Sequence, residues 1–410
     1  MKKYHICLIS EEFPPETGWG GIATYTHTLA KGLDRLGHKV SVITTTLSED
    51  HKSKIGKNIE VYHLKFHPPQ KIISKAIFNT FRFWHRNRKE VRHEVQLAWA
   101  FYKGFKHINS QEKIDIVEVP DYHFNGLFIS LFNSVPLAVK LHTPLIFNYY
   151  SNNLPIDSEV KWLDYFERLQ IRQCDLISSP SKLLKEKTEK WMKKLNKKIH
   201  VVPYAVDHET FHPIKGEREK IILFTGRLEV RKGVHILLKA FKKIAPKIPE
   251  YKLLLLGHDT ETFTLNGEKL FFKEYLKRTN LLDGIEDRVI FGGRVEREEL
   301  PKYFSKANFA VFPSVKFENF PFACLEGMSC GRGVIGTNSG GMAEMIEDGK
   351  SGFVVEPENV DQLAEKMLIL AKDEKLQEEF GKRSREIILE RYSLESQSER
   401  ILNYFKKVIK

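Results

Sequence analysis

The chain has 410 residues, a hydrophobic fraction of 41%, and 65 Lys and Arg against 53 Asp and Glu, a formal net charge of +12. This length predicts two or three domains, and the composition excludes collagenous, disulfide-scaffold and largely disordered proteins. The sequence has no run of about 18 apolar residues, which excludes a membrane-spanning helix. Residues 1–16 are typical of a first buried strand and loop rather than a signal peptide. The four scattered cysteines indicate reduced thiols in a cytoplasmic protein.

The first half of the chain alternates β-branched apolar runs with helical spacing. Strands are predicted at 4–10, 39–45, 59–66, 114–119, 137–141 and 176–178, with helices at 22–36 and 72–108. A polar, turn-rich segment at 204–213 predicts a linker.

The same pattern then restarts. Strands are predicted at 220–225, 252–256, 289–291, 309–312, 333–336 and 352–355, with helices at 234–244, at 321–329 and throughout 360–410. Ser393 is expected to cap the last helix. Alternating strands and helices predict an α/β protein with two consecutive parallel sheets.

The positive charge is concentrated in the first half. Residues 1–210 hold 31 Lys and Arg against 22 Asp and Glu, whereas the rest holds 34 against 31. Segment 71–113 is the densest, with 10 basic and 3 acidic residues. It fits a helix with a solvated basic face, an anionic membrane surface or a nucleic-acid contact. Its aromatic residues are Phe78, Phe81, Phe83, Trp84, Trp99, Phe101, Tyr102 and Phe105.

Loops that follow strands are the first candidates for a site, because open parallel sheets bind ligands beyond the carboxyl ends of their strands. In segment 225–233, Gly226 permits a tight turn, while Arg227 offers a planar donor fork and Lys232 a point charge. These groups suit a phosphate or diphosphate. The alternative is a solvated basic loop.

Segment 313–331 contains two carboxylates and a predicted helix start. Glu318 precedes a helix expected to begin near Pro321, so the free amides around 319–322 would present partial positive charge to an anion. Glu326 has apolar neighbours and is expected to be buried, where it would accept hydrogen bonds from a ribose diol. The alternative is a solvent-facing Glu326.

Three weaker candidates also follow predicted strands. Segment 337–344 has a Gly-Gly pair that would let the backbone approach a ligand. Gly20 and Gly21 enter the first helix as a candidate anion or sugar contact, without the GxGxxG pattern of dinucleotide-binding proteins. His142 is expected to face a ligand, although a lone histidine is more often structural.

In this order, the motifs resemble those of the retaining GT-B glycosyltransferases of glycosyltransferase family 4 (glycosyl transferases group 1). The resemblance spans essentially the whole chain. It implies two Rossmann-like domains whose parallel sheets face each other across a cleft. Residues 1–205 would bind the acceptor and residues 206–392 the nucleotide-sugar donor, with the final helix, 393–410, packing back onto the first domain.

The resemblance also implies residue roles. Arg227 and Lys232 would bind the donor diphosphate and stabilise the leaving group, while Glu326 would hold the ribose. Glu318 and His142 would contact the transferred sugar. Further donor contacts would come from Gly20, Gly21, Gly226, Asn319, Phe320 and Pro321, and from Val295 in the loop expected to meet the base. Asn319 stands where the family commonly has glycine.

The implied activity is front-face, retaining transfer of a hexose-type sugar from a UDP- or GDP-sugar to a sugar or lipid-linked acceptor. It would serve synthesis of cell-surface glycan, glycolipid or polysaccharide. No metal or other cofactor is expected, since cations and a helix N-terminus replace the divalent ion. The protein would be cytoplasmic, with peripheral contact to anionic membrane and no nucleic-acid partner.

Other interpretations stay open. Glu318 as a covalent nucleophile is the less favoured mechanism. A nucleotide-sugar 2-epimerase, an α-glucan phosphorylase and a catalytically silent binding protein are the rival functions. A phosphorylase would need a lysine-bound pyridoxal phosphate and a much longer chain.

Overall fold

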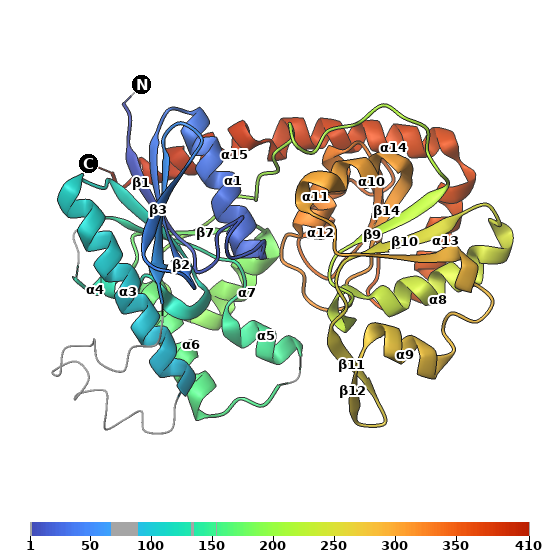
Figure 1. The fold of residues 1–410 in the computed structure, drawn as a ribbon, viewed down its shortest axis with the longest axis horizontal. Coiled ribbons are helices and arrows are strands. Elements are labelled where there is room, and N and C mark those ends of the chain that lie inside the picture. The colour runs from blue at the N-terminus through green and yellow to red at the C-terminus, as the bar shows by residue number, and fades with distance from the viewer. Residues whose placement is uncertain (1, 67–88, 133–134, 153, 410) are drawn as a thin grey trace. The chain divides into compact units, whose positions relative to one another are not determined.

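The computed structural model describes residues 2–66, 89–132, 135–152 and 154–409. The chain forms two compact units (Figure 1). Unit 1 comprises Met1–Ala205 and Leu394–Lys410, and unit 2 comprises Val206–Ser393. Each unit contains its own largely parallel sheet with helices around it, so the predicted α/β class is confirmed.

The sheet of unit 1 has the strand order β3-β4-β2-β1-β5-β6-β7-β8. Its strands are β1 (His5–Ile9), β2 (Lys39–Thr46), β3 (His51–Ile55), β4 (Ile59–Lys65), β5 (Ile116–Pro120), β6 (Leu137–Lys140), β7 (Leu176–Ser179) and β8 (Ile199–Val201). Neighbours run parallel apart from the antiparallel β3–β4 pair, in which His51 lies opposite His63. The edge strands β3 and β8 were not predicted, because neither carries the apolar run that marks a buried parallel strand.

The helices of unit 1 are α1 (Gly21–Arg35), α3 (Lys89–Gln111), α4 (Leu127–Phe132), α5 (Leu145–Ser151), α6 (Ser158–Gln173), α7 (Lys182–Met192) and α15 (Leu394–Phe405). Helix α15 packs beside α1 (Figure 1). Its Tyr404 hydroxyl donates to the Ile177 carbonyl at 2.9 Å and accepts from the Ile177 amide at 3.0 Å. The end of the chain is thereby fastened to strand β7.

Helix α3 is the described part of the predicted basic helix; residues 67–88 lie outside the described residues. Phe101 and Phe105 of α3 are fully buried, whereas Lys103 and Lys106 are exposed. Over this part, the segment is a helix with an aromatic core face and a solvated basic face.

The sheet of unit 2 is parallel throughout, with the order β13-β10-β9-β14-β15-β16. Its strands are β9 (Ile221–Thr225), β10 (Lys252–Leu256), β13 (Val289–Gly293), β14 (Ala307–Phe312), β15 (Gly333–Thr337) and β16 (Gly352–Val355). A separate antiparallel hairpin, β11 (Glu261–Leu265) with β12 (Glu268–Phe271), was not predicted. Apart from the buried Phe263 and Leu270, most of its residues are exposed and polar, so its apolar signal is weak.

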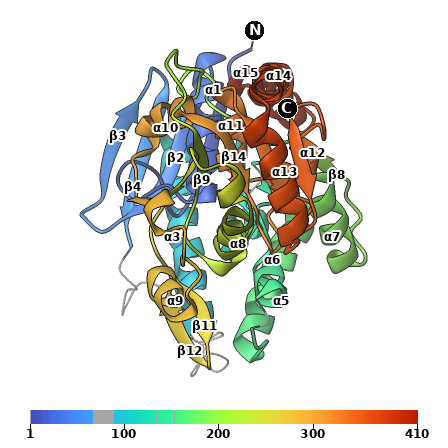
Figure 2. The same ribbon diagram turned by 90° about the vertical axis from the view of Figure 1, so that its right-hand side faces the viewer.

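The helices of unit 2 are α8 (Val234–Ile244), α9 (Phe272–Thr279), α10 (Leu300–Lys306), α11 (Phe322–Ser329), α12 (Met342–Met345), α13 (Val360–Lys372) and α14 (Glu374–Ile387). Helices α8 and α13 pack together (Figure 2). Residues 360–405, predicted as helical throughout with a final helix capped by Ser393, form α13, α14, a π segment at Ile388–Tyr392 and α15. Asp373 separates α13 from α14 by accepting a hydrogen bond from the Leu376 amide, and extended Ser393 precedes α15.

The four cysteines all lie in the described part of the chain, where they are buried and free. None of the helices that the structure describes has both the length and the apolar character needed to cross a membrane.

Candidate functional site

An ion cluster gathers beyond the carboxyl ends of β9 and β14 in unit 2. Lys232 Nζ lies 2.7 Å, and Arg231 Nη1 2.6 Å, from the same oxygen, Oε2 of Glu318. Arg231 Nη2 also donates to Glu229 Oε1 at 2.8 Å. The half-exposed Arg227 lies 3.3 Å from Glu229 Oε2. Three predicted site residues, Arg227, Lys232 and Glu318, are therefore brought into one cluster.

The cluster joins three cationic side chains to two carboxylates, so it carries one net positive charge when all are ionised. Burial raises the pKa of Glu318, but Arg231 and Lys232 outweigh it and hold that pKa at about 2. Burial lowers the pKa of Lys232, an effect that the Glu318 carboxylate opposes. Glu318 is thus a carboxylate at neutral pH, within a site that has positive charge in excess.

A glycine allows the two loops to meet. Gly233 has φ +70°, and a Cβ there would lie 1.8 Å from the Pro313 carbonyl oxygen. Beside this contact, the Val315 amide donates to the Arg231 carbonyl at 2.9 Å. The backbone that carries Arg231 and Lys232 is therefore fixed against the segment that leaves β14.

The predicted Gly-Gly pair packs closely against the backbone of the segment that carries Glu318. A Cβ on Gly340 would lie 1.8 Å from the Glu318 carbonyl oxygen, and one on Gly341 would lie 1.9 Å from that of Asn319. The Gly341 amide also donates to the Glu318 carbonyl at 3.0 Å. The close approach is to the chain's own backbone, and it sets the position of Glu318.

The entrance to α11 follows directly. Asn319 and Phe320 are buried, and the Phe320 ring meets Tyr392 edge-on with ring centroids 5.6 Å apart. Pro321 is the last residue before the helix, which begins at Phe322. Helix α11 is short, so its N-terminal amides are not a binding site by themselves. They add to the positive charge of the nearby side-chain cations.

Glu326 is buried, and the alternative of a solvent-facing carboxylate was wrong. Its Oε1 accepts from Arg297 Nε at 2.9 Å and Nη2 at 2.7 Å. Sequence reasoning missed Arg297, which lies 29 residues away in a short polar segment with no recognisable spacing. No role was predicted for Arg231 or Glu229, although both lie in segment 225–233 with the predicted Arg227 and Lys232.

The remaining candidates of unit 2 flank this region. Gly226 directly follows β9 and has φ +149°. Val295 is half-buried in the loop after β13. Nothing in their contacts assigns a ligand to either residue.

His142 follows β6 in unit 1 and is 9% exposed. Its backbone amide donates to Asp121 Oδ1 at 2.8 Å, and its Nδ1 lies 2.6 Å from the Tyr204 hydroxyl. Burial lowers the pKa of His142 well below its usual range, and Lys140 adds to the effect. The ring is therefore neutral, and a Tyr204 hydroxyl that donates to Nδ1 leaves the proton on Nε2.

The buried Lys140 lies over the Tyr204 ring. Lys140 Nζ donates to the Val202 carbonyl at 2.5 Å and lies 4.9 Å from the ring centre of Tyr25 and 5.3 Å from that of Tyr204. The Tyr25 hydroxyl donates to Glu118 at 2.9 Å. Burial lowers the pKa of Lys140, which Glu118 opposes. Sequence patterns gave no sign of this network, because its members come from separate elements.

Gly20 and Gly21 lie at the start of α1, as predicted. A Cβ on Gly20 would lie 2.6 Å from Glu12 Oε2, whereas a Cβ on Gly21 would meet nothing within 4 Å. Only Gly20 is therefore crowded by its surroundings.

Two family models match the chain. Residues 207–387 match the model described as "Glycosyl transferases group 1", and residues 19–210 match "Glycosyltransferase Family 4". Together they cover the residues that carry the ion cluster, Glu326 and His142.

Known proteins resemble the chain along its length. An uncharacterised glycosyltransferase of Methanocaldococcus jannaschii is 25% identical, over 98% of this chain and 97% of the relative. The structure of sucrose-phosphate synthase from Thermosynechococcus elongatus has a TM-score of 0.75 at 20% identity, covering 99% of both chains. HepE of Anabaena, solved in complex with UDP and glucose, has a TM-score of 0.67 at 18% identity, covering 98% of this chain and 99% of its own. These two solved structures are evidence for the fold of this chain and not for its activity.

Proposed function

Because the chain belongs to glycosyltransferase family 4 and has the GT-B fold, we propose that it transfers a hexose-type sugar from a nucleoside-diphosphate sugar to an acceptor hydroxyl. It is an enzyme of the glycosyltransferase class. The observation that carries the proposal is the ion cluster of Arg227, Arg231, Lys232 and Glu318 beyond parallel strand ends.

The cluster supports a diphosphate donor, UDP- or GDP-linked. Its excess positive charge suits a polyanion, and Lys232 has three donor hydrogens, so one can remain on Glu318 while another meets phosphate. Arg227, with its side chain 52% exposed, would supply a second cation. A similar fold has been solved with UDP and glucose, which agrees with this donor class.

These cations would act mainly in the transition state. When the bond between sugar C1 and the phosphate oxygen breaks, negative charge grows on the departing diphosphate. Preorganised cations stabilise that charge more than they stabilise the bound donor, which raises kcat. We propose that Arg227, Arg231 and Lys232 supply this charge without a divalent metal in the donor site.

We propose transfer with retention by front-face attack. The acceptor oxygen bonds to C1 on the face that the phosphate leaves, and the acceptor proton passes to the departing phosphate oxygen. Glu318 is poorly suited as a covalent nucleophile, because one of its oxygens already accepts from Arg231 and Lys232 and a carboxylate with a pKa of about 2 is weakly nucleophilic. Its proposed role is to contact the sugar hydroxyls.

Other residues would orient the donor. Glu326 would bind the ribose hydroxyls while Arg297 holds its Oε1. We propose that the Tyr204 hydroxyl donates to Nδ1 of the neutral His142, so that Nε2 carries the proton and donates to the transferred sugar. The backbone of Asn319 and Phe320 would lie near the sugar or phosphate, and Val295 near the base.

We further propose a sugar or lipid-linked acceptor in glycan, glycolipid or polysaccharide synthesis, used at an anionic membrane surface. Exposed Lys103 and Lys106 on α3 support such contact. So does Phe132, 56% exposed at the end of α4, with its ring 6.0 Å from that of Tyr102. Flotation with vesicles containing about 30% phosphatidylglycerol tests it; binding equal to that on neutral vesicles would reject membrane contact.

A donor screen tests the central proposal. UDP-, GDP- and ADP-sugars are incubated with the protein, with and without EDTA, and nucleotide release is measured before acceptors are added. We expect one nucleoside-diphosphate sugar to be consumed equally with and without EDTA, and NMR of the glycoside to show the donor's anomeric configuration. Inverted product would reject retention, and epimerised donor without transfer would indicate an epimerase.

A further inference from the structure

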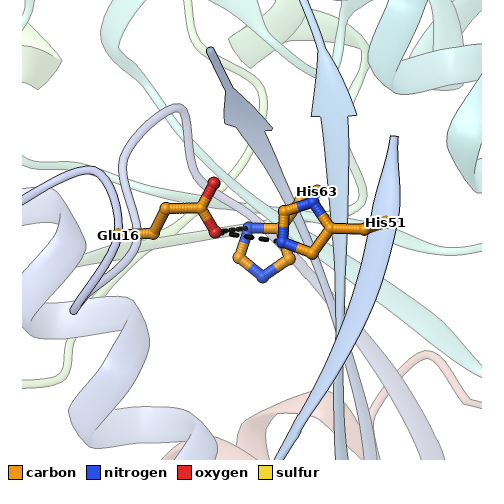
Figure 3. Close-up of side chains that lie close together, drawn as sticks. All are labelled: Glu16, His51 and His63. Atoms are coloured by element: carbon orange, nitrogen blue, oxygen red, sulfur yellow. Dashed lines mark hydrogen bonds and ion pairs between the residues drawn. The ribbon is translucent and has the colours of Figure 1, made fainter. Parts of the chain in front are cut away.

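Two histidines and a glutamate meet at the edge of the unit 1 sheet, away from the residues discussed so far. Glu16 comes from the loop between β1 and α1, His51 from β3 and His63 from β4 (Figure 3). Oε2 of Glu16 lies 3.1 Å from His51 Nε2 and 3.0 Å from His63 Nδ1. Among the residues described, these three could supply ligand atoms to one ion, and the atoms all lie within 4.8 Å of one another.

When the His51 ring is neutral, its hydrogen bonding leaves Nε2, the nitrogen that faces Glu16, without a proton. Nδ1 lies 3.0 Å from the Glu49 carbonyl oxygen. A carbonyl oxygen only accepts, so Nδ1 must carry the hydrogen and Nε2 a lone pair. That lone pair faces the Glu16 carboxylate oxygen at 3.1 Å. Two electron-rich atoms at this distance require a positive charge between or upon them.

His63 offers a second ring nitrogen beside Glu16. It is only 5% exposed, and its Nδ1 is buried without a hydrogen-bond partner, although it lies 3.0 Å from Glu16 Oε2. Its other nitrogen, Nε2, bonds to the Ser53 hydroxyl at 2.8 Å. The second oxygen of Glu16 accepts from the Thr46 hydroxyl. The sides of Glu16 and His63 that face away from their mutual contact are thus anchored, as in protein metal sites.

Protonation of both imidazole rings is disfavoured. The two imidazole rings are stacked, with centroids 4.2 Å apart and planes inclined by 6°. Two imidazolium charges at this distance repel each other, so protons on both rings are disfavoured.

We propose that Glu16, His51 and His63 bind one late first-row divalent transition metal, for which Zn²⁺ is the probe. Two imidazole nitrogens and one carboxylate oxygen suit such a metal and not Mg²⁺. Metal–ligand bonds of about 2.1 Å in a tetrahedral site place ligand atoms about 3.4 Å apart, near the 3.0 Å between His63 Nδ1 and Glu16 Oε2. Because the ion must lie in both ring planes, the exposed His51 side chain turns out of its stack to bind.

The site would join separate parts of unit 1. A bound ion would connect the β1–α1 loop, through Glu16, to the β3–β4 hairpin. The hydrogen bond from the Thr46 hydroxyl already connects Glu16 to the end of β2. The same loop leads into Gly20 and Gly21 at the start of α1. Metal binding would therefore restrain the loop that enters this helix.

Metal binding by untagged, EDTA-stripped full chain tests the proposal. Zn²⁺ is titrated by calorimetry, and Co²⁺ is added separately to record the visible absorption of a protein-bound ion. We expect one equivalent of Zn²⁺, competition between Zn²⁺ and Co²⁺, and no such binding of Mg²⁺. His51→Ala removes an exposed ligand with little risk to folding, and we expect at least about 100-fold weaker binding, since even outer partners of metal ligands are worth 10- to 100-fold.

A matched control separates this site from surface histidines. His107→Ala removes an exposed histidine of α3 and should leave Zn²⁺ affinity unchanged. Glu16→Gln should weaken binding and shift the Co²⁺ spectrum. The proposal is overturned if wild-type protein binds no stoichiometric Zn²⁺, or if His51→Ala and His107→Ala bind it as wild type does.

Discussion

Replacing Lys232 with alanine tests the catalytic role of the ion cluster. The substitution removes a cation that lies 2.7 Å from Glu318 Oε2 and, in the proposed reaction, stabilises the leaving diphosphate. Loss of one preorganised charge-stabilising group typically lowers kcat by about 10²- to 10³-fold, equivalent to about 3–4 kcal/mol. We expect a loss of that size with saturating donor.

The same substitution should leave the protein folded. Arg231 remains 2.6 Å from Glu318 Oε2, so the buried carboxylate keeps one cationic partner. Loss of one charged hydrogen bond costs about 1–3 kcal/mol, less than the roughly 5–15 kcal/mol by which domains are stable. We therefore expect cooperative urea unfolding at a lower midpoint, so the fall in kcat cannot be attributed to unfolding.

The assay pairs steady-state donor turnover with urea denaturation for wild type, Lys232→Ala and Lys239→Ala. Lys239 is an exposed cation on α8 and serves as a control for the loss of one charge. A Lys232→Ala enzyme that keeps more than about a third of wild-type kcat would refute the reasoning, because an effect below 1 kcal/mol excludes contact with the developing charge.

Three further substitutions or conditions test the neighbouring structure. Tyr204→Phe removes the hydroxyl 2.6 Å from His142 Nδ1; turnover should fall by up to about tenfold, and imidazole ¹⁵N shifts should show a changed tautomer. The pKa of Glu318, about 2 against an ordinary 4.5, adds about 3 kcal/mol of stability above pH 4.5. This stability should disappear as pH falls from 4.5 to 2, and Glu318→Gln should flatten that part of the unfolding profile. Gly341→Ala places a Cβ 1.9 Å from the Asn319 carbonyl oxygen and should cost ~1–3 kcal/mol, whereas Gly216→Ala meets nothing within 4 Å and should change stability little.

Each of these has a contrary result. Unchanged ¹⁵N shifts in Tyr204→Phe would mean that the hydroxyl does not set the His142 tautomer. Acid unfolding that Glu318→Gln leaves unaltered would remove Glu318 from the pH dependence. Equal stability of Gly341→Ala and Gly216→Ala would show that the backbone contact relaxes without cost.

The buried strands could be predicted from the sequence, because a parallel strand covered on both faces is a nearly continuous apolar run. Strand β10, Lys252–Leu256, matches its predicted range for that reason. Strand β3, with the sequence HKSKI, lies at a sheet edge with much of its surface in water and offers no such run. The π segment Ile388–Tyr392 continues the apolar spacing of α14, so sequence spacing did not reveal the change.

The candidate site was predictable where topology alone decides position. Loops that follow parallel strands share one edge, so Arg227, Lys232 and Glu318 could be expected together. Their partners could not be predicted, because a pairing such as Arg297 with Glu326 joins segments 29 residues apart and depends on side-chain packing. The cluster of Glu16, His51 and His63 could not be predicted for the same reason. His51 and His63 become neighbours only through the register of β3, a strand that was not predicted.

The way in which α15 completes unit 1 also affects the order in which the chain folds during synthesis. Unit 2 is a single stretch, Val206–Ser393, and all its strands are available once that stretch has left the ribosome. Unit 1 begins earlier, yet its β7 lacks the Tyr404 hydrogen bonds, and its α1 lacks the contact with α15, until residues 394–405 follow. The unit that is translated first is therefore the last to be finished, and in the interval its α1 face is open to chaperones or to aggregation.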